Sequence, residues 1–163
     1  MCSSDLGGEL IAKAVNHTAK PTVWDCTGGL GRDSFVLASL GLNVQTFEQH
    51  PAVACLLADG LERALQEPEI QDIARRITFR HGDAVELMRE LAAQSRPDIV
   101  YLDPMYPERQ KSAAVKKEMA YFHSVVGAAQ EEAELLAAAR AVAKKRVVVK
   151  RPRLGELDRR AHV

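Results

Sequence analysis

The stretch WDCTGGLGRDSF at residues 24–35 is typical of a strand that turns tightly into a helix. A short strand-like run at 22–24 leads into it, and glycines follow at 28, 29 and 31. Glycine has no Cβ, so such a turn bends sharply and lets a ligand approach the backbone. The helix after the turn offers free N–H groups at its start. Ordinary strand–helix turns also contain glycine clusters, so the neighbouring residues must decide whether a ligand binds.

The rest of the chain repeats this alternation of strand and helix. Further strand candidates lie at 42–48, 76–83, 97–103 and 146–150. Helical patterns lie at 32–40, 51–65, 84–94 and 131–145, and Pro51 suits a first helical position. Unbroken apolar strands that alternate with helices are typical of a parallel sheet covered on both faces. The sequence therefore predicts an α/β fold with a doubly wound, mainly parallel sheet.

The organised part of the chain is expected to be one domain over residues 10–153. A short helical pattern at 9–17 opens it. Residues 1–9 are interpreted as a non-native or disordered start, and 154–163 as a truncated tail. The sheet is therefore expected to be truncated at both ends.

The composition is that of a globular protein, with 47% apolar and 27% charged residues among 163. Basic and acidic residues both number 22, so the net charge of zero does not point to a polyanionic partner. No apolar run approaches the roughly 18–20 residues of a membrane span, and the start lacks the features of a signal peptide. The three cysteines fit no zinc pattern. We expect a cytoplasmic protein with reduced thiols, no membrane partner and no metal.

The residues around the glycines discriminate among three classes of ligand. A Walker A loop needs Gly-Lys-Ser/Thr, which is absent, and a dinucleotide fingerprint needs glycine where this chain has Ser34. Asp25, ahead of the glycines, would repel a pyrophosphate but suits an ammonium or sulfonium group. The pattern Asp25-x-Thr27-x-Gly29-x-Gly31 therefore disfavours an NTPase and an NAD-dependent reductase and favours a cationic ligand.

Acidic residues end four successive strand candidates, namely Asp25, Glu48, Asp83 and Asp103. The carboxyl ends of parallel strands face one crevice, where ligands bind. An acid at the end of the second strand, Glu48, can accept hydrogen bonds from both ribose hydroxyls. Asp83 is placed to meet an adenine edge. These residues predict a nucleoside ligand.

The segment DPMYP at 103–107 follows the fourth strand candidate. Pro104 and Pro107 fix the backbone and lack N–H donors, so the segment is neither strand nor helix. Asp103 and Tyr106 therefore stand on a stiff turn at the crevice, where the Tyr106 ring can stack on a base. An ordinary proline-rich turn is the alternative.

Together these residues resemble the Rossmann-like class I S-adenosylmethionine-dependent methyltransferases. DCTGGLG is similar to their first motif, Glu48 to their ribose-binding acid, and DPMYP to the Asp/Asn-Pro-Pro-aromatic motif of enzymes that methylate exocyclic amines of nucleobases. Four blocks in order, GLGRDSFVLASLG, YLDPMYP, QKSAAVKKEM and KRVVVKRP, resemble the ribosomal small-subunit methyltransferase J family. That family methylates a guanine N2 in bacterial 16S ribosomal RNA.

The resemblance implies S-adenosylmethionine as the cofactor. The positions that match the family's cofactor contacts are Arg32, Asp33, Glu48, Gln49, Asp83, Ala84 and Asp103; Asp25, Gly29 and Gly31 of the turn join them. Asp103 is expected to orient the amine and stabilise its developing charge, and the Pro104 carbonyl to accept a second hydrogen bond. With Tyr106 stacked on the base, these are the predicted catalytic residues.

Two basic clusters, at 109–117 and 144–153, point to a nucleic acid. The residues expected to contact RNA phosphates are Lys111, Lys116, Lys117, Lys150 and Arg151, with surface solubility as the alternative. The implied partner is 16S ribosomal RNA or the small ribosomal subunit. Two alternatives stay open: an exocyclic-amine methyltransferase acting on a DNA base, tRNA or protein glutamine, and a non-catalytic RNA-binding module.

Overall fold

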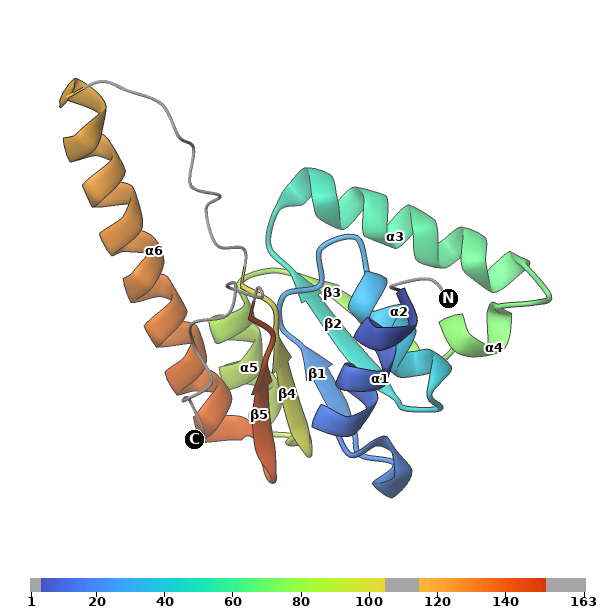
Figure 1. Cartoon of the computed structure of the whole chain (residues 1–163). Coiled ribbons are helices and arrows are strands. Elements are labelled where there is room, and N and C mark those ends of the chain that lie inside the picture. The colour runs from blue at the N-terminus through green and yellow to red at the C-terminus, as the bar shows by residue number, and fades with distance from the viewer. Residues whose placement is uncertain (1–3, 105–114, 152–163) are drawn as a thin grey trace.

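One parallel sheet forms the centre of the protein (Figure 1). The computed structural model describes residues 4–104 and 115–151, with side chains over 8–104 and 126–151. The strands of these ranges are β1 (Val23–Asp25), β2 (Val44–Glu48), β3 (Ile77–His81), β4 (Ile99–Leu102) and β5 (Arg146–Val149). Their order in the sheet is β3-β2-β1-β4-β5, and every pair is parallel. The predicted α/β fold with a parallel sheet is confirmed.

Helices cover both faces of this sheet (Figure 1). On one side lie α1 (Ser4–Ala14), α2 (Arg32–Ser39), α3 (Pro51–Gln66) and α4 (Gln71–Ala74), and on the other α5 (Ala84–Ala92) and α6 (Val115–Val142). A 3₁₀ turn, η1 (His17–Ala19), joins α1 to the sheet. Within the described ranges, no helix combines the length and hydropathy needed to cross a membrane.

Local signals in the sequence explain where several helices begin. Pro51 is the first residue of α3, and the His50 side chain caps that helix by accepting from the Val53 N–H. Asp83 caps α5 in the usual way, since its carboxylate accepts from the Glu86 N–H at 3.0 Å.

Two helices differ from the sequence prediction. α1 begins at Ser4, inside the stretch interpreted as a non-native or disordered start; its residue Ile11, and Val15 just after the helix, pack into the core. α6 is a single helix from Val115, whereas the pattern indicated only 131–145. No proline lies between Pro107 and Pro152 to interrupt it.

Neighbouring residues of the strands supply two separate cores, because alternate side chains of a strand point to opposite faces. Val23 and Tyr101 belong to the cluster under α1 and α2. Trp24 and Val100, one position away in each strand, belong to the cluster under α5 and α6. In this second cluster Trp24 meets Phe47 edge to face, with ring centroids 5.6 Å apart.

The order of the strands fixes where a ligand can bind. From β1 the chain moves outward through β2 to β3, then returns to the other side of β1 to form β4 and β5. Val23 of β1 is accordingly paired with Val44 of β2 and with Ile99 of β4. Such a reversal opens a crevice at the carboxyl ends of the strands, next to β1.

The turn after β1 packs directly on β2 through Gly28. The Gly28 N–H donates to the Phe47 carbonyl at 2.8 Å. A Cβ on Gly28 would lie 2.9 Å from that carbonyl oxygen and would also collide with the Thr46 methyl group. The turn therefore keeps its path only with glycine at this position.

We expect Gly28→Ala to lower the free energy of unfolding by about 1–3 kcal/mol, because the backbone of β2 cannot move aside. Gly60→Ala is the matched control: Gly60 lies in α3 with nothing within 4 Å of an added Cβ. This control should be neutral or stabilise by about 0.5–1 kcal/mol. Urea unfolding measures both, and equal effects of the two substitutions would contradict the close approach of Gly28 to β2.

Candidate functional site

The turn between β1 and α2 lies at the crevice and contains two glycines in a left-handed conformation. Gly29 has φ 53° and Gly31 has φ 80°. A Cβ on Gly31 would also lie 2.6 Å from the Leu57 Cδ1 atom. Gly31 immediately precedes α2, so the free N–H groups at the start of this helix face the turn. The two glycines let the backbone turn sharply here, whereas Leu30 between them is 70% exposed.

Asp25 lies beneath this turn, with its side chain directed into the protein. Its residue is 1% exposed, and the carboxylate accepts hydrogen bonds from the Thr27 N–H at 3.1 Å and the Ser34 hydroxyl at 2.5 Å. Since the Ser34 hydrogen goes to Asp25, the Thr46 hydroxyl donates to Ser34 at 2.7 Å. Asp25 therefore supports the turn from inside, whereas the sequence suggested that it faces a cationic ligand directly.

Burial raises the pKa of Asp25 from 3.8 to about 6. The hydrogen bonds from Ser34 and Thr27 oppose the rise, and the negative charge of Asp33 adds to it. The folded protein thus retains a proton on Asp25 to a higher pH than the unfolded chain does.

Glu48 joins the end of β2 to the glycine turn. One carboxylate oxygen accepts from the Gly29 N–H at 2.8 Å, and the other accepts from the His50 N–H at 3.0 Å. The next residue, Gln49, is exposed, and its carbonyl lies 3.1 Å from the His81 ring. The acid predicted to bind ribose therefore lies against the turn.

Asp83 and Ala84 follow β3 beside Glu48. The Gly82 N–H donates to the Glu48 carbonyl at 3.0 Å, which sets the position of Asp83 relative to β2. Asp83 is exposed and caps α5, and Ala84 is half-buried as the first residue of that helix. The structure thus brings the predicted adenine side of the site next to its predicted ribose side.

Asp103 lies on the other side of the same turn. Its backbone N–H donates to the Thr27 hydroxyl at 2.7 Å, and its side chain is 39% exposed. Pro104 follows it and is half-buried. The turn is therefore bonded to an acid on each side, to Glu48 through Gly29 and to Asp103 through Thr27.

A charge network joins Asp103 to the first turn of α2. The Lys150 ammonium lies 3.1 Å from the Asp103 carboxylate and 3.0 Å from that of Asp33. The Tyr101 hydroxyl donates to Asp33 at 2.8 Å. Burial, followed by the hydrogen bond to Asp33, raises the pKa of Tyr101 far above its usual value, so Tyr101 remains a donor.

The structure places the remaining predicted residues unevenly. Arg32 is exposed at the start of α2, and Arg151 pairs with Glu132 at 3.3 Å. Lys116 and Lys117 lie on the first turn of α6, although their side chains fall outside the described ranges, as do Tyr106 and Lys111 altogether. Lys150, predicted to contact RNA, pairs with Asp33 and Asp103.

Sequence reasoning missed the supporting hydroxyl groups and Tyr101. Ser34 was treated only as a departure from a dinucleotide fingerprint, and Thr46 and Tyr101 only as strand residues. Ser34 follows the glycine turn that begins at Asp25. A serine at this position is the signal that could have revealed the hydrogen-bond partner of Asp25. Among the described residues no group of three or more His, Cys, Asp or Glu side chains is arranged to hold a metal.

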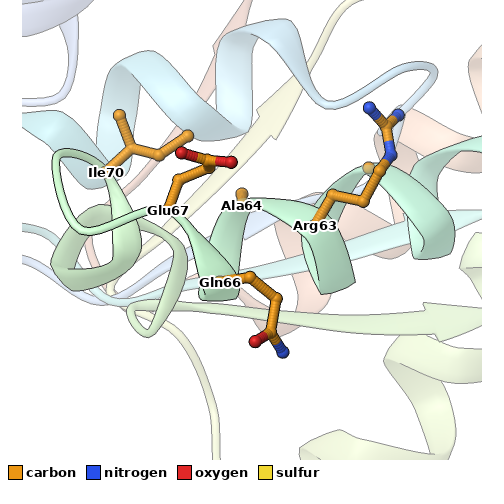
Figure 2. A pocket seen from close by; sticks show the side chains of 6 residues that line it. Arg63, Ala64, Gln66, Glu67 and Ile70 are labelled. Atoms are coloured by element: carbon orange, nitrogen blue, oxygen red, sulfur yellow. The ribbon is translucent and has the colours of Figure 1, made fainter.

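A separate hollow lies at the end of α3 (Figure 2). Its lining is Gly60, Arg63, Ala64, Gln66, Glu67 and Ile70. Glu48 precedes the opposite end of α3, so this hollow belongs to a different part of the molecule from the crevice. Its one acid and one base do not form a catalytic arrangement.

The chain is similar to known methyltransferases. A family model described as "Putative SAM-dependent methyltransferase" matches residues 3–161. The ribosomal RNA small subunit methyltransferase J of Neisseria gonorrhoeae is 74% identical over 151 residues, which are 92% of this chain and 60% of that protein. The corresponding protein of Tolumonas auensis is 59% identical over 148 residues, 89% of this chain and 59% of that one. This chain thus spans about 60% of the length of these relatives.

A solved structure supports the same fold. The crystal structure of a SAM-dependent methyltransferase from Neisseria gonorrhoeae matches with a TM-score of 0.78 and 65% sequence identity. The match covers 91% of this chain and 61% of that one.

The raised pKa of Asp25 predicts a specific pH dependence of stability. Because the pKa of Asp25 is about 6 in the folded protein and 3.8 without the effect of burial, ionisation of Asp25 costs stability as the pH rises through this window. Asp25→Asn has no such cost. We expect the unfolding free energy of the variant, minus that of the wild type, to increase by about 2–3 kcal/mol from pH 4 to pH 7.

Urea unfolding at several pH values measures this difference. Asp59→Asn is the control, since the Asp59 side chain is 63% exposed, and its difference from the wild type should stay nearly flat. A difference for Asp25→Asn that falls with rising pH would mean that the buried carboxylate has a lowered pKa.

Proposed function

Since the chain belongs to the family of SAM-dependent methyltransferases, we propose that it transfers a methyl group from S-adenosylmethionine to the exocyclic N2 of a guanine in 16S ribosomal RNA. The name of its 74% identical relative, a ribosomal RNA small subunit methyltransferase, supports this substrate. The proposed partner is 16S ribosomal RNA or the small ribosomal subunit, and such a substrate would place the activity in the cytoplasm.

The observation that carries the proposal is the bonding of one glycine turn to two acids. Gly29 binds Glu48 and Thr27 binds Asp103, although the two acids follow different strands. This arrangement aligns a nucleoside-binding acid and an amine-binding acid across one backbone turn. The turn therefore connects the predicted cofactor side of the crevice, at Glu48, with the predicted substrate side, at Asp103.

The charges around the turn and its glycines support S-adenosylmethionine as the ligand of the crevice. Several carboxylates gather around the turn, with Lys150 as a cation between two of them, and an acidic surface suits a sulfonium and an ammonium group. Glycine at 29 and 31 lets a ligand approach the backbone. The residues proposed to hold the cofactor are Gly29, Gly31, Arg32, Asp33, Glu48, Gln49, Asp83, Ala84 and Asp103, with Asp25 supporting the turn from below.

When bound, S-adenosylmethionine supplies an electrophilic methyl group. The remaining requirement is to orient a weakly nucleophilic amine and to stabilise the charge that develops on its nitrogen. The Asp103 carboxylate is partly exposed and can accept a hydrogen bond from that amine. The Pro104 carbonyl is proposed as a second acceptor and the Tyr106 ring as the surface on which the base stacks.

The proposed RNA surface lies beyond the crevice. Lys116 and Lys117 stand at the start of α6, a helix that extends past the carboxyl ends of the strands (Figure 1). With Lys111 and Arg151 they are proposed to contact phosphates, which gives affinity without sequence specificity. Lys150 is treated separately below.

Cofactor binding tests the first half of the proposal. Titration calorimetry with S-adenosylmethionine should show binding to the wild type and at least about tenfold weaker binding to Glu48→Ala, since the lost carboxylate is the proposed ribose acceptor. Asp59→Ala removes an exposed carboxylate of α3 and should leave the dissociation constant unchanged. Absence of binding to the wild-type chain would refute the methyltransferase proposal for this chain.

Methyl transfer tests the second half. With labelled cofactor, we expect label in 16S ribosomal RNA or the small subunit, located at guanine N2 by mass spectrometry. Asp103→Ala should lower kcat by about 10²-fold or more, because the amine loses its acceptor. Methyl transfer only to DNA, tRNA or peptide would support a methyltransferase but contradict ribosomal RNA as its substrate. RNA binding without cofactor binding would favour a non-catalytic binding module.

A further inference from the structure

Lys150 occupies an unusual place for a residue expected to contact RNA. It follows β5, and its backbone N–H donates to the Leu102 carbonyl at 2.8 Å, directly before Asp103. Its ammonium lies 3.0 Å from Asp33 and 3.1 Å from Asp103. One side chain therefore connects the start of α2, the end of β4 and the end of β5.

The Lys150 ammonium neutralises two neighbouring carboxylates, those of Asp33 and Asp103. The Asp33 side chain is only 14% exposed, so its carboxylate is poorly screened by water. Partial burial opposes the charge on Lys150, but hydrogen bonds to Asp33 and Asp103 outweigh this and raise the pKa of its ammonium. Without this cation, the carboxylates of Asp33 and Asp103 would lose the donor that they share, and Asp33 would keep the hydrogen bond from the Tyr101 hydroxyl.

We propose that Lys150 is a positioning residue for methyl transfer: its ammonium holds Asp33 and Asp103 in one arrangement and so sets where Asp103 meets the substrate amine. This inference rests on the function proposed above. Thr27 holds the backbone of Asp103 and Lys150 holds its carboxylate, so Asp103 is fixed at both ends. Its exposed surface is then the part that remains available to an amine.

The same contacts argue against a phosphate as the partner of Lys150. A phosphate at this ammonium would lie beside two carboxylates, which repel it. Arg151, the next residue, lies 3.3 Å from the carboxylate of Glu132, and its side chain is 61% exposed, so it stays a candidate for RNA.

Three variants of the full chain separate these roles. Lys150→Met removes the charge, Lys150→Arg retains it, and Lys13→Met is the control, because Lys13 lies on α1, outside both basic clusters, with its side chain 74% exposed. Circular dichroism and urea unfolding establish that each variant is folded. We expect Lys150→Met to lower kcat by about five- to tenfold, Lys150→Arg to recover most of it, and Lys13→Met to match the wild type.

Two readouts distinguish positioning from a contact with RNA. For a positioning residue, the KM for RNA and the salt dependence of RNA binding stay as in the wild type. For a phosphate contact, Lys150→Met raises the KM for RNA and lowers the salt slope by about one, with kcat and cofactor affinity unchanged. That second result, or wild-type behaviour of Lys150→Met, would overturn the proposal.

The contacts of the two acids with Lys150 provide a test that needs neither cofactor nor activity. Lys150→Met removes the donor that both carboxylates share, whereas Lys150→Arg keeps a charged donor there. In the ligand-free protein at one pH, the NMR chemical shifts of the Asp33 and Asp103 carboxyl carbons should change in Lys150→Met and stay closer to those of the wild type in Lys150→Arg.

A residue that merely supported the fold would reduce the amount of active protein without changing these chemical shifts in the folded fraction, and such a result would also contradict the proposal. If the wild type fails to bind cofactor or to methylate RNA, the proposed function itself fails. The two failures are distinguishable, because the NMR measurement reports the contacts of Lys150 whether or not the protein methylates RNA.

Discussion

The buried carboxylate of Asp25 is the constraint on which the crevice depends. It binds the Thr27 N–H and the Ser34 hydroxyl, and so it ties the start of the glycine turn to the first turn of α2. Thr27 in turn accepts from the Asp103 N–H. Burial of a charged carboxylate away from water is unfavourable, and hydrogen bonds to it offset only part of this free-energy cost. These hydrogen bonds therefore fix the path of the turn, and the turn positions the acids that are bonded to it.

Several carboxylates surround that turn, and the Lys150 ammonium partly neutralises their negative charge. Asp33 and Asp103 share this one ammonium, whereas Glu48 is satisfied by backbone N–H groups of Gly29 and His50. Two of these carboxylates are thus held by a side-chain ammonium and the third by backbone N–H groups. A cationic ligand would enter an environment whose negative charge is already oriented, which avoids reorganisation on binding.

Much of this site could be read from the chain itself. Apolar strands, glycines at 28, 29 and 31, and acids after four strands are local signals, and they predicted a parallel sheet with a crevice at its carboxyl edge. The ends of the helices were harder to predict from the sequence. Helix propensity is weak compared with tertiary packing, and α1 begins at Ser4, before the helical pattern that the sequence shows at 9–17.

What the sequence determined by itself was the sheet, the turn and the set of acids, because periodicity and the backbone freedom of glycine act over a few residues. Only the tertiary structure decided how those acids are used. Asp25 turned out to point inward, and Lys150 was found between Asp33, 117 positions away, and Asp103. Thr27 and Asp103 meet across 76 positions. Such pairs depend on strand order and register, which place distant segments together and leave no local pattern from which the contact can be read.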